Sequence, residues 1–331
     1  MSVDINRRSV LALTAAALGG CAVPPRAEVM AALAGAKNAE LNGIWIWLST
    51  FADTLQAGGM SVEVAANSAL GGESDRTELS ALGLIHVNDA NIQEVSAFSP
   101  AYVALELPFL IDGFAHFERF VDAPEFRRDV NRQLRRSGMV FADAALLGGA
   151  SGLFTVGRAV RSPADLHGMR LRGSDARSLV LIESFGALSV QVAWEEVPQA
   201  LQTGIAAGYL NPPIAALLFG HASQLDYFVD LRTTIAHRAI VMSRRWLDGL
   251  SAEQRALVER GTQAARSANR AWAEERRRRE LSALTDAGIE VVSLSDEARR
   301  AFVERGLRAY TRMAPPDVVA TAIAAAGRTR P

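Results

Sequence analysis

Two polar side chains of the segment 166–213 lie where predicted strands end, and their chemistry suits an anion. The run MRLR predicts a short strand that ends at Arg172, and the run AAGYLN, before two prolines, predicts a strand that ends at Asn211. Ligands of open α/β sheets bind at the carboxyl ends of strands. A guanidinium suits a carboxylate because it offers parallel N–H donors and keeps its charge. We therefore expect Arg172 and Asn211 to hold an organic anion.

The residues alone leave an ordinary alternative open for both side chains. Lys37 is the only lysine, so nearly all positive charge is arginine, and Arg172 could belong to a surface salt bridge. An asparagine before proline is often only a turn residue. Trp194, which ends the predicted strand LSVQVAW, is expected to form a wall of the same pocket.

The elements around these side chains follow an α/β pattern. Near the central segment, alternation and helical spacing predict strands and helices in turn at 169–172, 176–186, 188–194, 195–204 and 206–211. Upstream, Glu73 begins a predicted helix and Asn88 ends the predicted strand 84–88. One charged helix is expected over 116–136, and the glycine-rich run 148–152 is expected to be a hinge or crossover.

One predicted helix is much longer than the others. It begins at Ser251, which forms a capping box with Gln254, and its helical spacing continues to about Asp286. At 1.5 Å per residue its length is roughly 50 Å. A helix of this length can pass from one domain to another. The basic run 276–279 inside it is flanked by glutamates, which is typical of a solvated helix face.

The composition argues against several classes of function. The net charge is −1 and 49% of the residues are hydrophobic, as in ordinary globular proteins, so no nucleic-acid partner is expected. Cys21 is the only cysteine and the five histidines show no i, i+4 pair, so neither a metal site nor a cofactor is expected. The glycine-rich run also lacks the GxSxG pattern of a hydrolase nucleophile, because Leu153 occupies the last glycine position.

The first residues are typical of a targeting segment. Arg7 and Arg8 precede a short apolar run at 10–18, and the sequence LGGC that ends at Cys21 resembles a lipobox. The paired arginines also resemble a twin-arginine signal. We therefore expect residues 1–21 to be a signal or lipoprotein segment and the protein to be periplasmic, exported by the Sec or the Tat route. Cys21 is either a lipid anchor or a cysteine without a role.

Motifs in the central segment resemble one known family. They are SPADLHGMRLR at 162–172, GALSVQVAWEEVPQALQTG at 186–204 and GYLNP at 208–212. Further similarity lies in the run from Ser61 to Val87 and in ELPFLI at 106–111. As a set these motifs resemble the extracytoplasmic solute-binding proteins of tripartite ATP-independent periplasmic (TRAP) transporters, the dicarboxylate-binding, DctP-like family.

This resemblance implies roles for the residues named above. Arg172 falls on the strand-end arginine that pairs with the ligand carboxylate, Asn211 on an asparagine of the site, and Trp194 on an aromatic residue beside it. Glu73 and Asn88 complete the candidate ligand-binding residues. No catalytic residue and no metal ligand is expected.

The sequence also departs from the pattern of the family. Ala207 and Leu210 replace acidic residues that are usual there, and Ser151 and Gly152 occupy the region of a further arginine. Other arginines could supply that charge, namely Arg158, Arg161 or Arg177. A ligand with a single carboxylate is therefore a fair hypothesis, and the choice between one carboxylate and two stays open.

The resemblance further implies an α/β fold of two domains, a periplasmic-binding-protein clamshell with a long domain-spanning helix. The expected division is 28–149 plus 237–275 for the first domain and 150–236 plus 276–329 for the second. The expected partners are a small organic acid and the membrane permease subunits of a TRAP transporter. Two other hypotheses remain: an exported hydrolase-type enzyme, and a ligand-sensing module of a membrane receptor.

Overall fold

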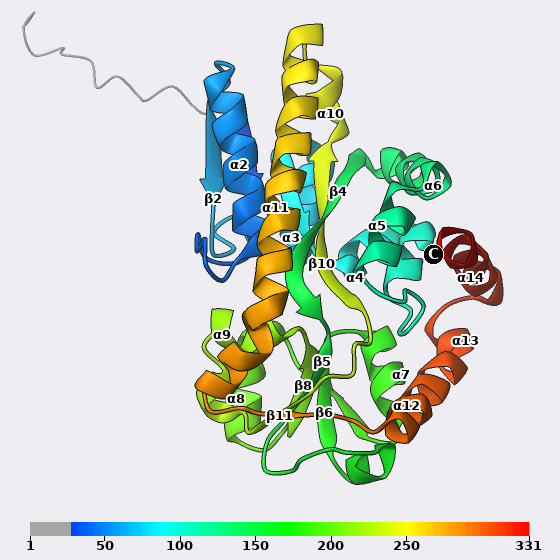
Figure 1. Cartoon of the computed structure of the whole chain (residues 1–331). Coiled ribbons are helices and arrows are strands. Elements are labelled where there is room, and N and C mark those ends of the chain that lie inside the picture. Colours follow the sequence, from blue (N-terminus) through cyan, green and yellow to red (C-terminus); the bar gives the residue numbers. More distant parts are fainter. Residues whose placement is uncertain (1–27, 331) are drawn as a thin grey trace, which may run out of the picture.

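The computed structural model describes residues 28–330 and consists of two α/β lobes. The lobes lie one above the other in Figure 1, and one long helix runs along both. The predictions for residues 1–21, including the signal segment and Cys21, lie outside the described residues.

The first lobe is built on a mixed sheet with the strand order β2-β1-β3-β10-β4. Its first three strands are parallel, and β10 is antiparallel to both of its neighbours. The bounds of these strands are β1 (Val29–Ala32), β2 (Val62–Ala65), β3 (Val87–Ala90), β4 (Met139–Ala150) and β10 (Ile235–Ser243).

The second lobe is built on a sheet with the order β11-β9-β5-β8-β6-β7. Here β6 is parallel to β7 and β8, whereas β5 is antiparallel to β8 and β9. Its strands are β5 (Gly152–Thr155), β6 (Arg170–Gly173), β7 (Leu188–Gln191), β8 (Gly208–Asn211), β9 (Tyr227–Val229) and β11 (Glu290–Val292).

Helices cover both sheets. The α-helices have the bounds α2 (Gly43–Ala57), α3 (Glu73–Leu82), α4 (Ile92–Phe98), α5 (Phe114–Asp122), α6 (Pro124–Leu134), α7 (Ala176–Phe185), α8 (Val197–Gln202), α9 (Pro213–Leu218), α10 (Arg244–Asp248), α11 (Ala252–Asp286), α12 (Asp296–Arg308), α13 (Tyr310–Met313) and α14 (Pro316–Thr329). Short 3-10 helices are η1 (Pro100–Leu105), η2 (Arg135–Ser137), η3 (Pro163–Leu166), η4 (Trp194–Glu196) and η5 (Ala222–Gln224).

The long helix α11 confirms the prediction at 251–286, and Ser251 caps it as expected. A buried asparagine fixes this helix to the first lobe: the Asn269 amide donates to the carbonyls of Gly43 (2.8 Å) and Leu146 (3.0 Å) and accepts from the Leu146 N–H (2.8 Å). A Cβ at position 43 would lie 2.4 Å from both the Leu146 carbonyl and the Trp272 ring, so the close packing of α2 on β4 and α11 requires glycine there.

Two extended segments cross side by side between the sheets. One leads from β4 into β5 through Ser151, and the other leads from β9 into β10. Backbone bonds join them: the Ser151 N–H donates to Thr234 and the Thr233 N–H donates to Ser151. The crossover expected at 148–152 is thereby confirmed. Gly149 lies directly against the Glu280 carboxylate on α11, and a Cβ there would lie 1.6 Å from it, so this position has no room for a side chain.

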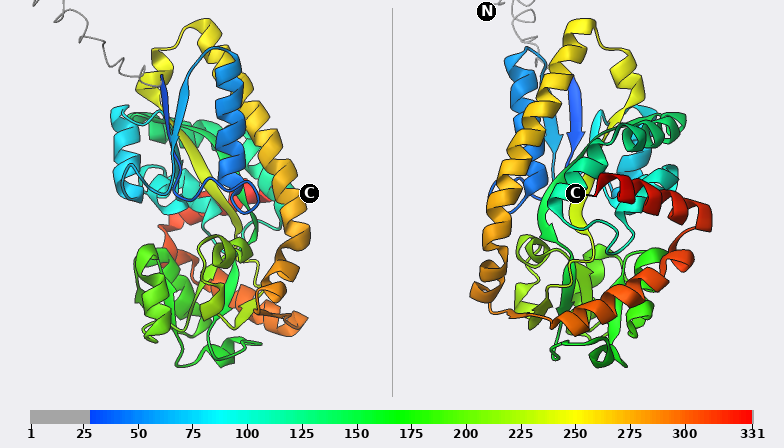
Figure 2. Two further views of the ribbon diagram at one scale, coloured as in Figure 1. Left: turned by 90° about the vertical axis from the view of Figure 1, so that its left-hand side faces the viewer. Right: turned by 45° about the vertical axis from the view of Figure 1, so that its right-hand side comes forward.

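The last helix returns to the first lobe. Figure 2 shows the red C-terminal segment beside the first lobe, and α14 packs on η1 and α5 there. This packing differs from the predicted assignment of 276–329 to the second domain. The two-lobed α/β architecture with a long spanning helix is shown, whereas the other predicted domain boundaries stay a prediction.

Three local expectations need correction. The single helix expected over 116–136 is two helices, because Pro124 forces Ala123 out of the helical region (φ −56°, ψ 124°). The strand expected over 84–88 is shifted to 87–90, and Leu84 is exposed. Trp194 does not end a strand, since β7 stops at Gln191 and Trp194 begins a 3-10 turn.

Candidate functional site

A cavity of about 600 Å³ lies where the two lobes meet. The second lobe contributes Arg172, Trp194 and Asn211 to its lining, and the first lobe contributes Glu73. Four of the five predicted site residues are therefore brought to one cavity, although they lie on four separate elements, namely α3, β6, η4 and β8. The carboxyl ends of β6 and β8 supply Arg172 and Asn211, as the strand-end argument predicts.

Arg172 is buried, with 8% of its surface exposed. Its Nε donates to the Val192 carbonyl at 2.9 Å, and the guanidinium lies over the Trp194 ring with its carbon 5.4 Å from the ring centroid. Among residues 28–330, no hydrogen bond or ion pair engages its two terminal nitrogens. Burial lowers the pKa of this guanidinium, because removal from water disfavours its charge. The arrangement presents a fork of donors to the cavity without a protein counterion.

The Trp194 ring is held by a cluster of rings from neighbouring elements. It contacts Tyr209 on β8 edge-on, and Phe219 and His221 after α9. The Tyr209 hydroxyl is 3.2 Å from His221 Nδ1. Burial lowers the pKa of His221, and the positive charge of Arg172 acts in the same direction. His221 is therefore neutral near pH 7, so it packs against Trp194 and leaves Arg172 as the cation of this wall.

Asn211 closes the same wall from β8. It pairs with Gly152 on β5, and Pro212 and Pro213 follow it and start α9. Its side chain is half-buried and makes no hydrogen bond within residues 28–330. The amide is thus available to donate to or accept from a ligand.

The wall of the first lobe carries a network of two acids and two arginines. Arg238 on β10 donates to both Glu73 oxygens, at 2.7 and 2.8 Å, and its Nε lies 3.2 Å from Asp89. Arg76 on α3 lies 3.0 Å from Glu73 and 3.5 Å from Asp89. Glu73 lines the cavity, but its negative charge is neutralised by these two arginines.

The two acids of this network have different pKa values. Burial raises the pKa of Asp89 to about 6, and Arg238 and Arg76 counter only part of this effect. Burial also acts to raise the pKa of Glu73, but Arg238 and Arg76 outweigh it, so the pKa is lowered. Both acids are therefore ionised near neutral pH, and Asp89 is the one that takes up a proton first as the pH falls.

Asn88 is not at the site. It lies in the central strand β3, it is fully buried, and its side-chain oxygen accepts from Arg76 Nε at 3.4 Å. It does not belong to the lining of the cavity. The prediction for Asn88 followed from a strand placed three residues too early, so the structure corrects it.

Several lining residues were not predicted. Arg238 and Glu106 lie inside apolar runs, and only the tertiary fold brings them to the cavity. Asn67 and Ser68 have positive φ angles, 55° and 53°, in the loop after β2. This conformation is strained for residues other than glycine and is frequent at functional sites. Asn91, which caps α4, adds another amide to the lining.

Glu106 and Arg177 meet across the cavity. Arg177 Nη1 lies 3.3 Å from both carboxylate oxygens of Glu106, although Arg177 is on α7 of the second lobe and Glu106 follows η1 of the first. The Ser96 hydroxyl also donates to Glu106. Burial raises the pKa of Glu106, and Arg177 and Ser96 reduce that rise.

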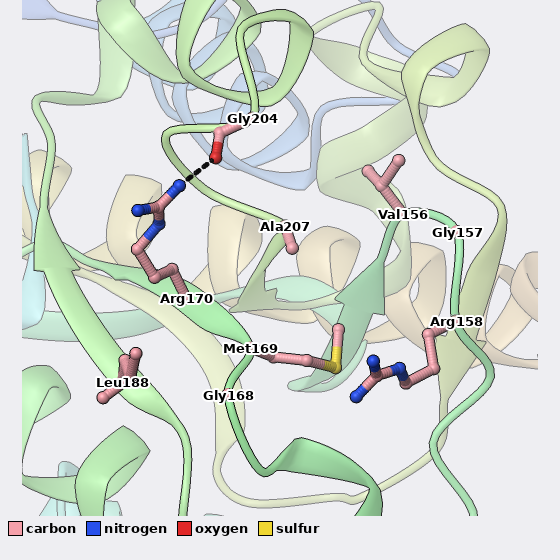
Figure 3. A pocket seen from close by; sticks show the side chains of 9 residues that line it. All are labelled: Val156, Gly157, Arg158, Gly168, Met169, Arg170, Leu188, Gly204 and Ala207. Carbon is pink, nitrogen blue, oxygen red and sulfur yellow. Dashed lines mark hydrogen bonds between the residues drawn. The ribbon is translucent and has the colours of Figure 1, made fainter.

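A second hollow, of about 500 Å³, lies in the second lobe away from these residues. Figure 3 shows Arg158 and Arg170 in its lining, with Arg170 bonded to the Gly204 carbonyl at 2.8 Å. Arg158 donates to the carbonyl of Asp165 at 3.1 Å. Both arginines are exposed and bound to backbone carbonyls, so the hollow lacks the buried unneutralised cation of the cavity between the lobes.

Residues 28–330 contain no cluster of three or more histidine, cysteine, aspartate or glutamate side chains placed to hold a metal ion. In the same range no helix has the length and apolar character needed to cross a bilayer.

A ligand-sized cavity between two α/β lobes, with a buried arginine that lacks a protein counterion, defines a two-lobed solute-binding protein. The sequence profile described as bacterial extracellular solute-binding protein, family 7 (DctP), matches residues 36–316. The chain therefore belongs to this family, which confirms the resemblance to TRAP-type binding proteins. The members of this family are solute-binding proteins, and the family is extracellular.

Individual relatives agree with the family. The C4-dicarboxylate-binding periplasmic protein DctP of Rhodobacter capsulatus is 25% identical over 260 residues, which cover 75% of this chain and 74% of that protein. A solute-binding protein of Verminephrobacter eiseniae is 26% identical over 258 residues, with 76% of each chain covered. A TRAP periplasmic solute-binding protein from Bradyrhizobium sp. BTAi1, in complex with galacturonate, has a TM-score of 0.81 at 24% identity and covers 91% of this chain and 99% of its own.

Proposed function

We propose that this protein captures an organic acid between its lobes by one carboxylate bound to Arg172, and delivers it to the membrane permease of a TRAP-type transporter. The observation that carries the proposal is the buried Arg172 guanidinium, whose terminal nitrogens have no partner within residues 28–330. A bidentate carboxylate would supply the missing counterion. Closure of the lobes removes water and strengthens that pairing.

We further propose a sugar acid as the ligand class. The lining combines Arg172 with amide and hydroxyl groups at Asn67, Ser68, Asn91 and Asn211, which suit a polyhydroxylated carboxylate. Structural neighbours are described with bound galacturonate, glucuronate and galactonate, which supports this class. A curated relative from Escherichia coli is named a 2,3-diketo-L-gulonate-binding protein, and that name points in the same direction.

Isothermal titration with a panel of sugar acids tests the carboxylate anchor. Arg172→Ala should lower the affinity about 100-fold or more, since removal of one partner of a buried charge pair costs about 2–5 kcal/mol. Arg170→Ala is the matched control: Arg170 lies on the same strand but is exposed and faces the second hollow. It should change the affinity less than twofold. Equal losses in the two variants would contradict the assignment of Arg172.

The proposal also covers where the protein acts and whether it catalyses a reaction. We propose export to the periplasm through residues 1–21, with Cys21 as a candidate lipid anchor, and a binding role without catalysis. The family consists of extracellular solute-binding proteins, which supports both points. Fractionation of cells and the mass of the mature protein test export and lipidation. Turnover of an ester or a sugar acid by the purified protein would contradict the binding role.

A further inference from the structure

The cavity contains more acidic than basic side chains. Its lining includes five carboxylates, those of Glu73, Asp89, Glu106, Asp175 and Glu195. It includes three arginines, Arg172, Arg177 and Arg238. An acidic ligand can bind in such a cavity only where an arginine is not already neutralised by the protein. The partners of the three arginines therefore determine how many ligand carboxylates fit.

Two of the three arginines are already paired. Arg238 is bonded to Glu73 and Asp89 within the first lobe. Arg177 faces both carboxylate oxygens of Glu106, and its Nε donates to the Met313 carbonyl at 3.2 Å. Of the three, Arg172 alone has no ion pair with a carboxylate in the described part of the chain, and neither of its terminal nitrogens is engaged there.

We propose that Glu106 determines specificity for acids with one carboxylate, because its own carboxylate occupies the place on Arg177 that a second ligand carboxylate would need. This inference rests on the proposed function and names the substrate class of that same site. Glu106 is well placed for such a role, since its side chain is 5% exposed and the Ser96 hydroxyl holds it.

A diacid meets two obstacles in this cavity. Its second carboxylate must displace Glu106 from Arg177, and the displaced side chain would then be a buried acid without a cation. Asp175 lies nearby, since its charge acts on both Glu106 and Arg172, and it adds repulsion against a second anion. A monoacid meets neither obstacle, because Arg172 binds its one carboxylate and the rest of the ligand carries no charge.

Matched pairs of sugar acids test this inference by titration calorimetry. The probes are D-gluconate with D-glucarate and D-galactonate with D-galactarate, in which the second member of each pair carries one more carboxylate. The wild-type protein should bind at least one monoacid, and should bind its diacid at least tenfold more weakly. Comparable affinities for both members of a bound pair would overturn the inference. This comparison needs no variant, so it holds even if a substitution at buried Glu106 prevents folding.

Glu106→Gln should release Arg177 and raise the affinity for the diacid, relative to the monoacid, at least tenfold. The double variant Glu106→Gln/Arg177→Gln should lose that gain, because the released cation is then absent. If Glu106 served only to join the lobes, Glu106→Gln would weaken both acids equally, and that result would overturn the inference.

The same experiments distinguish an error in the proposed binding function from an error in the proposed role of Glu106. If no sugar acid or other carboxylate bound to the wild-type protein, or if Arg172→Ala bound them as well as the wild type, the proposed function itself would be wrong. If a diacid bound more tightly than its monoacid and still depended on Arg172, the anchor would stand and only the specificity role of Glu106 would be rejected.

Discussion

The two walls of the cavity treat charge in opposite ways. On the first lobe, Arg238 and Arg76 are bonded to Glu73 and Asp89, so that wall neutralises itself. On the second lobe, Arg172 lies over Trp194 with no carboxylate bonded to it. Removing one partner from an internally paired wall leaves an uncompensated buried charge, whereas an unpaired buried cation already carries its desolvation cost and is free to bind an anion. The second wall therefore selects for ligand charge.

The largest effect on the free energy of unfolding is expected when the ion-pair network of the first lobe is broken. Arg238→Ala leaves Glu73 and the fully buried Asp89 short of a cation, and should lower the free energy of unfolding by about 3–5 kcal/mol. Arg244→Ala is the control, because its pair with Asp248 is exposed and should contribute less than about 1 kcal/mol. Urea unfolding without ligand measures both. A loss for Arg238→Ala no greater than the control would show that the network does not stabilise the first lobe.

A smaller effect on stability is expected where the end of β4, which leads into the second lobe, contacts α11. Glu280 on α11 accepts from the Gly149 N–H at 2.8 Å, and burial raises its pKa from 4.5 to about 7. Between these values the folded chain holds a proton that the unfolded chain has released. The contribution of Glu280 to stability is therefore complete below about pH 4.5 and falls as the pH rises to about 7, by up to about 1.4 kcal/mol per pH unit.

Glu280→Gln should remove that decline. Unfolding by urea at about pH 5 and pH 8 measures it as a smaller difference in stability than the wild type shows. Glu259→Gln, at an exposed position of the same helix, should keep the decline of the wild type. An unchanged pH dependence in Glu280→Gln would mean that this buried acid does not titrate in the range given above.

The smallest effect on stability is expected from Arg172 itself in the absence of ligand. Arg172→Ala loses the bond to the Val192 carbonyl and the contact with Trp194, but it also removes a buried charge without a counterion. The free energy of unfolding should stay within about 1 kcal/mol of the wild type. A loss of unfolding free energy as large as that of Arg238→Ala would contradict the claim that the arginine of the first wall is paired within the protein and that of the second is not.

The sequence predicts the second wall better than the first. The sequence places Arg172 and Asn211 correctly at the ends of β6 and β8, because the strand–helix pattern of 166–213 is local and regular. Gly186 ends α7 in the left-handed conformation, as expected. The first wall depends on contacts between distant segments: Arg238 meets Glu73 across 165 positions of the chain. Such pairs leave no signal in local spacing.

The errors arise where local sequence patterns do not determine the position of a residue. Asn88 was placed at the end of a strand because LIHVN is apolar from its first residue, whereas Leu84 is exposed and the strand begins at Val87. Glu106 lies in the apolar run before Pro108 and was not expected to face a cavity, because its partner Arg177 is on the other lobe. Tertiary contacts decided both positions.

The return of α14 to the first lobe has a consequence for how the chain folds. The second sheet is completed by β11 at 290–292, and the core of the first lobe includes Val319 and Ala322 of α14. Neither lobe can therefore complete its core before nearly the whole chain has been synthesised. Because domains generally fold as units, both lobes are expected to reach their final packing late and together.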